Sequence, residues 1–220
     1  MNVVKKITIA AAFLCTATVA NAQDDGLKVG ARASYSLQSF GGYKDEPLKS
    51  AFSPDMGTVG AGVGLVLSIP AGPISIAPEV AFLYRQNYTM TDKDNGTSDE
   101  ITQTEFAISI PVLVKWFPIE GLFAQAGVQV DIPIAAELCS DKADKCFAQD
   151  GGSGENSVPF ERATVDFGIV VGTGYFVTSN FGIDFRYVIG LLPAETVDAG
   201  GKKFESNPLH SMSVGFTYLF

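Results

Sequence analysis

The stretch that decides the fold is Pro208 to Phe220, which reads PLHSMSVGFTYLF. From Leu209 onward, large apolar side chains alternate with small or polar ones, and this period of two is typical of a β-strand with one apolar face. In a water-soluble sandwich such a face would point into the core. The apolar face of this strand consists of Met212, Val214, Phe216, Tyr218 and Phe220.

The same alternation recurs in seven earlier segments, at about residues 27–37, 57–69, 74–88, 102–117, 122–134, 161–177 and 181–191. Each is at least as long as the roughly 9–11 residues that a tilted strand needs to cross a bilayer. The connections are alternately long and short, as in outer-membrane barrels with long outer loops and short periplasmic turns. The sequence therefore predicts an all-β, eight-stranded antiparallel up-and-down transmembrane β-barrel with four long outer loops.

The amino terminus has the pattern of an export signal. Two lysines at 5–6 precede an apolar run at 7–19 and the small-residue site Ala-Asn-Ala at 20–22. An apolar run of this length is too short for a transmembrane helix, which needs about 20 residues. We expect a secretory signal peptide at 1–22 and a barrel domain at 23–220 in the bacterial outer membrane. A lipid anchor at Cys15 is the disfavoured alternative, because bulky Leu14 precedes it.

The charged residues of the strands fall on the face opposite the apolar one, five basic against five acidic. A charge on the lipid face would cost about 2–4 kcal/mol near the midplane, and an eight-stranded barrel is just wide enough for side chains to fill it. We expect a plugged lumen centred on Arg32, Glu79, Asp166, Asp184 and Arg186, with a structural salt-bridge core favoured over a proton or ion relay. The other inward charges are Lys28, Arg85, Glu105, Lys115 and Asp131.

Aromatic residues of the outer face should form two girdles at the membrane interfaces. With the expected topology, five lie near the periplasmic rim and five toward the outer rim. The periplasmic set is Trp116, Tyr175, Phe181, Tyr218 and Phe220, and the outer set is Tyr35, Tyr84, Tyr88, Phe106 and Tyr187.

Cys139 and Cys146 lie close together in a polar segment, and in an oxidising compartment we expect them to form a loop disulfide. A metal site is the alternative, although no His lies nearby. The acidic segment 89–101 partly matches a calcium loop, but its glycine is one place early, so we expect a solvated turn with a weak ion site as the alternative. The glycines at 60, 62 and 64 alternate within a strand and should leave room for lumen side chains. We expect no cofactor.

The long connections are acidic, with fifteen acids against seven lysines. This charge disfavours nucleic acid as a partner. Outer-membrane lipids are the expected partners instead.

The mature chain resembles the PorT-like outer-membrane β-barrel family, the outer membrane protein β-barrel domain group. That resemblance implies a barrel with a surface or secretion-support role, and the aromatic last strand resembles the signal that the outer-membrane assembly machinery reads during folding. The resemblance rests on Gly30-Ala31-Arg32, on Ala77 to Val80, on Ile108 to Lys115, on Ala126 to Gln129, on Asp166-Phe167-Gly168, on Phe185-Arg186-Tyr187 with Gly190-Leu191, and on the aromatic terminus.

These observations favour a non-enzymatic integral outer-membrane protein with a structural, surface-interaction or secretion-support role. One alternative is a lipid-modifying barrel enzyme, for which His210 beside Ser211 is the only His/Ser pair, although their side chains point to opposite faces. A second alternative is a narrow channel. A soluble barrel of the lipocalin type is the rival fold, but it would leave the aromatic girdles without a role.

Overall fold

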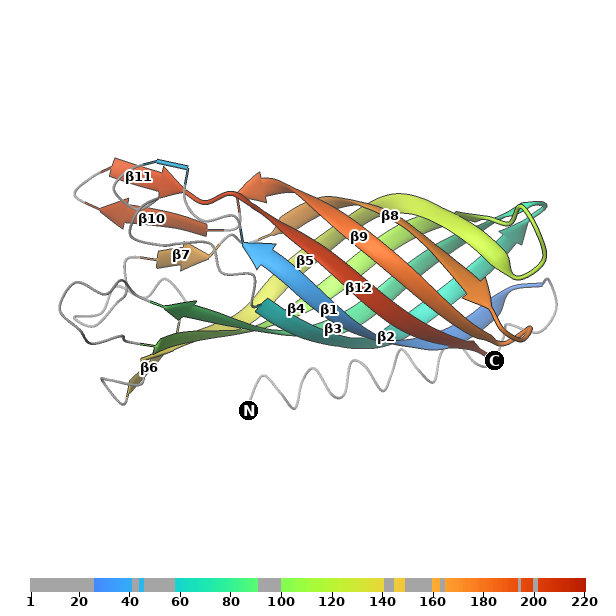
Figure 1. Cartoon of the computed structure of the whole chain (residues 1–220), viewed down its shortest axis with the longest axis horizontal. Helices are drawn as coiled ribbons and strands as arrows, with labels where there is room; N and C mark the ends of the chain where they lie inside the picture. The colour runs from blue at the N-terminus through green and yellow to red at the C-terminus, as the bar shows by residue number, and fades with distance from the viewer. Residues whose placement is uncertain are drawn as a thin grey trace.

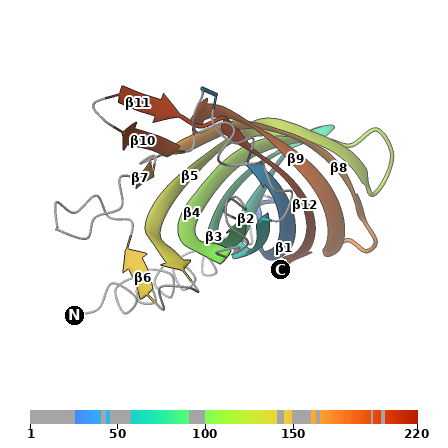
Figure 2. The same cartoon turned by 60° about the vertical axis from the view of Figure 1, so that its left-hand side comes forward.

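The computed structural model describes residues 26–40, 44–45, 58–90, 100–140, 145–148, 160–162, 165–193, 195–199 and 202–220, so the expected signal peptide lies outside it. Within these ranges, eight long antiparallel strands close into a barrel (Figures 1 and 2). The predicted all-β, eight-stranded barrel is thus confirmed. Its strands are β1 (Lys28–Phe40), β2 (Thr58–Ala71), β3 (Ile74–Met90), β4 (Glu100–Trp116), β5 (Leu122–Ser140), β8 (Asp166–Phe176), β9 (Phe181–Pro193) and β12 (Pro208–Leu219).

Closure comes from the pairing of the first strand with the last. β1 and β12 pair from Gly30↔Leu219 to Phe40↔Leu209, and each remaining barrel strand pairs with its two neighbours in chain order. This ladder leaves no open edge in the barrel wall, as a bilayer requires of a β-structure. No helix among the described residues is long and apolar enough to cross a membrane.

Four short strands that the sequence did not predict lie beyond one end of the barrel, which we call the loop end (Figure 1). β6 pairs with β5, and the other three form a separate sheet in the order β11-β10-β7. The predicted strand at 161–177 is therefore shorter than expected, because its first residues belong to β7. The four are β6 (Lys145–Ala148), β7 (Phe160–Arg162), β10 (Glu195–Ala199) and β11 (Lys202–Glu205).

The opposite end, which we call the turn end, carries the short connections and the carboxy-terminus (Figure 1). Gly72 and Gly121 hold positive φ angles of 67° and 80° there, which glycine adopts without strain. The turns also bond to their neighbours: the Phe176 amide donates to the Gly121 carbonyl at 2.8 Å, and the Leu219 amide donates to the Asn180 carbonyl at 2.8 Å.

The two faces of the wall differ as the alternation predicts. Large apolar side chains stand exposed on the outside, for example Val63 at 63% and Val214 at 42%, while Leu113 and Val170 on the inside are fully buried. The alternative of a soluble lipocalin-type barrel, in which the apolar faces line an internal cavity, is therefore wrong. The glycines of β2 serve close packing: a side chain at Gly64 would collide with the backbone of Val80.

A candidate site in the barrel lumen

The lumen contains nine of the ten charged residues expected to point inward, and the structure sorts eight of these nine into two clusters. The tenth, Lys28, is exposed at the start of β1. We call Arg32, Glu79, Asp184 and Arg186 the central cluster, and Arg85, Glu105, Asp131 and Asp166 the loop-end cluster. Lys115 is the ninth. Asp166 was expected in the central group, but it pairs with Arg85 instead.

The central cluster bridges the lumen. Arg186 donates from Nη1 and Nη2 to the two carboxylate oxygens of Glu79 at 2.8 and 2.7 Å, and from Nε to Asp184 at 2.8 Å. Arg32 holds the same aspartate through Nη2 at 2.8 Å and Nε at 3.2 Å. The side chains of Arg186 and Glu79 are only 4% and 3% exposed. Two cations thus neutralise two carboxylates, with the planar forks that favour bidentate Arg–carboxylate pairs.

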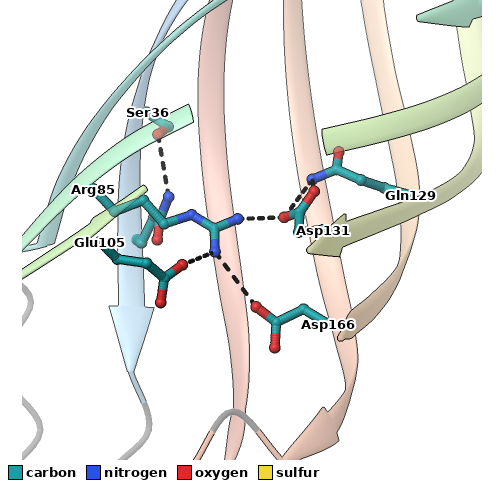
Figure 3. A network of polar contacts seen from close by, with 7 residues as sticks. Ser36, Arg85, Glu105, Gln129, Asp131 and Asp166 are labelled. Atoms are coloured by element: carbon teal, nitrogen blue, oxygen red, sulfur yellow. Dashed lines mark hydrogen bonds and ion pairs between the residues drawn. The ribbon is translucent and has the colours of Figure 1, made fainter. Parts of the chain in front are cut away.

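The loop-end cluster gathers three carboxylates around Arg85 (Figure 3). Its guanidinium donates to Glu105 at 2.8 Å, to Asp166 at 3.4 Å and to Asp131. Gln129 supports Asp131 with bonds of 3.0 Å to both oxygens. A pocket of about 20 Å³ adjoins this cluster and is lined in part by Asp131, Asp166 and Ser211. That volume suits roughly one water molecule.

Lys115 lies toward the turn end of the lumen, where its ammonium group contacts two aromatic rings. Its Nζ stands 5.0 Å from the ring centre of Phe123 and 5.9 Å from that of Phe176, within the range of cation–π contacts. These rings and Phe117 pack with centroid distances of 5.5–6.4 Å. Sequence reasoning missed this cluster, although Phe123 and Phe176 fall on the lumen face in the same alternation that placed the charges.

Apolar side chains fill the space between the charges. Val66, Ala77, Leu113, Val170 and Leu219 form a buried group, against which Phe176 and Val188 pack. The described lumen is consequently a mixed core of ion pairs and apolar side chains.

The expected girdle residues lie on the outer wall. Near the turn end, Trp116 is 53% exposed and Tyr218 is 50% exposed. Toward the loop end, Tyr84 packs against Phe106 with centroids 5.4 Å apart. Also on the outer face are Tyr35, Tyr175, Phe181, Tyr187 and Phe220, whereas the side chain of Tyr88 lies outside the described residues.

The other candidate residues are not brought together as a reaction site. His210 stacks on Tyr187 at a centroid distance of 6.3 Å on the outer face, while Ser211 lines the lumen pocket. Among the described residues, no group of three His, Cys, Asp or Glu side chains is arranged to hold a metal ion. Residues 91–99 of the acidic segment lie outside the description.

The cysteines were expected to pair. Cys139 and Cys146 are direct backbone partners in the β5–β6 ladder. Their side chains lie outside the description, and the disulfide stays a prediction.

Comparisons with known proteins place this geometry in context. A family model described as "Outer membrane protein beta-barrel domain" matches residues 21–194. No curated protein matches the sequence. Similar solved structures include the attachment invasion locus protein Ail of Yersinia pestis, at 12% identity and a TM-score of 0.41, covering 88% of this chain and 98% of that one.

Two further structures have comparable values. A major outer membrane protein from Thermus thermophilus has 15% identity and a TM-score of 0.47, covering 89% of this chain and 100% of that one. OprG from Pseudomonas aeruginosa has 12% identity and a TM-score of 0.42, covering 88% of this chain and 95% of that one.

Proposed function

Since the chain belongs to the outer membrane protein beta-barrel domain family and is an integral barrel of the bacterial outer membrane, we propose that it is a non-enzymatic, non-conducting scaffold. In this role the barrel anchors folded loop-end strands at the cell surface for a partner. The observation that carries the first half of the proposal is the ion-paired central cluster.

The lumen supports a non-conducting barrel. Arg186 and Glu79 join strands that lie four places apart in a closed order of eight described strands, so their bond crosses the full width of the interior. Toward the turn end, Phe123 is 2% exposed and its ring packs against that of Phe176. An ion crossing the barrel would have to separate a desolvated, bidentate pair, and removal of one partner from such pairs costs about 3–5 kcal/mol.

The loop end supports a role in display. β7 belongs to the connection between β5 and β8, whereas β10 and β11 belong to the connection between β9 and β12, and the three share one sheet. Lys44, from the connection after β1, joins them: its amide donates to the Glu205 carbonyl at 3.2 Å, and its Nζ pairs with the Glu205 carboxylate at 3.2 Å. Three connections therefore build one structure, which can present a fixed surface.

The resemblance to PorT-like barrels supports secretion support as the specific use of that surface. A catalytic role has less support, because His210 and Ser211 face opposite sides of the wall. Acyl transfer needs a nucleophile within hydrogen-bond reach of its base.

Planar bilayer recording tests the scaffold proposal. Wild-type protein, shown to be folded by its heat-modifiable migration in detergent, should give no steady conductance steps. The double variant Glu79→Ala/Arg186→Ala is the matched comparison, since it removes the bond that crosses the lumen. Steady steps from wild-type protein would overturn the non-conducting half of the proposal.

A capture experiment on intact cells tests the display half. In one variant a short Gly/Ser linker replaces residues 195–205, which removes β10 and β11, and in the control the turn 177–180 is replaced. We expect the control to retain the surface proteins captured by wild type and the hairpin variant to lose at least one. Identical sets from all three proteins would contradict display.

A further inference from the structure

The central cluster and Lys115 together have a net charge of +1. Arg32, Arg186 and Lys115 face only two carboxylates, Glu79 and Asp184, which the arginines already engage. Lys115 is 4% exposed, and no carboxylate of the described residues forms an ion pair with it. Its described partners are the faces of two phenylalanine rings at 5.0 and 5.9 Å.

Ring contacts alone are a weak compensation for burying an ammonium group. Cation–π contacts stabilise a buried ammonium group by less than the loss of its hydration costs. The net charge of +1 on the central cluster and Lys115 therefore calls for a further negative partner near Lys115.

Gln125 is a second, independent sign of a missing partner. It is 4% exposed, and neither its Nε2 nor its Oε1 has a hydrogen-bond partner in the described part of the chain. The great majority of buried side-chain polar atoms have a hydrogen-bond partner, so an unpaired amide of this kind indicates a ligand or a water at this place.

The ladder places Gln125 between two of the cations. Lys115 pairs with Gln125 across β4 and β5, Gln125 pairs with Gly172 across β5 and β8, and Gly172 pairs with Arg186 across β8 and β9. Gly172 has no side chain, and a Cβ there would stand 3.1 Å from Gln125 Nε2. Gly172 therefore contributes no side chain between the unpaired amide of Gln125 and Arg186.

We propose that the Lys115–Gln125 rung binds one small monovalent anion of the halide class, with the Lys115 ammonium and the Gln125 Nε2 group as its donors. Donors dominate this rung, and a single negative charge brings the five charged residues to neutrality. Both donors end flexible side chains that can close on an ion. A divalent anion would reverse the imbalance, and an organic carboxylate is too large for an eight-stranded lumen filled by its own side chains.

Thermal unfolding in matched salts tests the proposal. The midpoint of heat-modifiable migration is measured in sodium chloride and in sodium gluconate at equal ionic strength, gluconate being too large to enter. We expect chloride to raise the wild-type midpoint by about 2–4 °C, and Lys115→Met and Gln125→Leu to abolish the difference. Lys44→Met, which removes an exposed amine, should keep it. Equal wild-type midpoints in the two salts would overturn the site.

Bromide diffraction on wild-type crystals locates the ion directly and does not depend on any variant folding. An anomalous peak within hydrogen-bond distance of Lys115 Nζ and Gln125 Nε2 supports the proposal. Peaks at the surface only, which would mark an adventitious ion only, or a water between these two groups, would overturn it.

Discussion

Arg186 of β9 donates two hydrogen bonds to Glu79 of β3, at 2.7 and 2.8 Å, although the two residues lie 107 positions apart in the sequence. Their strands stand on opposite sides of the barrel. The pair therefore links two walls that share no backbone ladder, and it does so inside a barrel whose outer surface is apolar.

Removing one member of this pair should destabilise the barrel strongly. Arg186→Met leaves the Glu79 carboxylate buried without its main partner, and we expect a loss of about 3–5 kcal/mol in unfolding free energy. Urea unfolding in lipid vesicles measures it. The double variant Glu79→Leu/Arg186→Met should recover most of the loss, because no buried charge is left unpaired.

An exposed pair supplies the matched control for that experiment. Lys44 and Glu205 are 43% and 57% exposed, and exposed pairs contribute roughly 0–1 kcal/mol. Lys44→Ala should therefore change the unfolding free energy little. A loss as large as that of Arg186→Met would contradict the importance given to burial.

Gly64 allows β2 and β3 to approach each other. A Cβ at this position would meet the Val80 carbonyl oxygen and the backbone of Ala81, neither of which can move independently of its strand. We expect Gly64→Ala to cost about 1–3 kcal/mol, as overpacking does. Ala61→Val, on the outer face of the same strand, should be close to neutral, and equal effects of the two changes would contradict this packing.

A charged side chain on the outer face of the barrel should destabilise the protein. Val214 lies in the middle of β12 and is 42% exposed, so Val214→Arg places a guanidinium in the hydrocarbon layer at a cost of about 2–4 kcal/mol. Ile119→Arg, in the turn between β4 and β5, is the control. Unfolding in vesicles should separate them, and equal stability would mean that Val214 does not face lipid.

The period of two in the sequence was enough to assign the faces of the strands, because neighbouring side chains in a strand must point to opposite sides. It could not give the height of a residue along the barrel axis. Strand tilt and stagger set that height, and they bring Asp166, the first residue of β8, to Arg85 near the end of β3. The expected grouping of Asp166 with Arg186 failed for this reason.

The alternation of apolar and polar residues also could not predict the small strands at the loop end. β7 has three residues and β11 has four, too few for an alternation to stand out from polar loop sequence. Their pairing depends on the barrel bringing distant connections to one end. The sequence also could not show that the Gln125 amide is unpaired, because only the strand pairing shows which residues flank it.

The cysteine pair is open to a simple test. Cys139 and Cys146 are backbone partners, and we expect a disulfide in protein made in an oxidising compartment. Thiol labelling of unfolded mature protein should find no free cysteine without reductant and two with it. Cys139→Ser should expose one reactive thiol without reductant, whereas two free thiols in the unreduced wild type would contradict the bond.

The most direct test of the whole arrangement uses Trp116, the only tryptophan of the chain. Trp116 is 53% exposed on the outer wall at the end of β4, where a barrel with lipid-facing apolar residues places it in the interfacial girdle. Its fluorescence is measured in vesicles whose acyl chains carry bromine either near the headgroup or near the bilayer centre. Strong quenching, greatest for the shallow bromine, is the predicted result; absence of quenching by both lipids would contradict an outer wall that faces lipid.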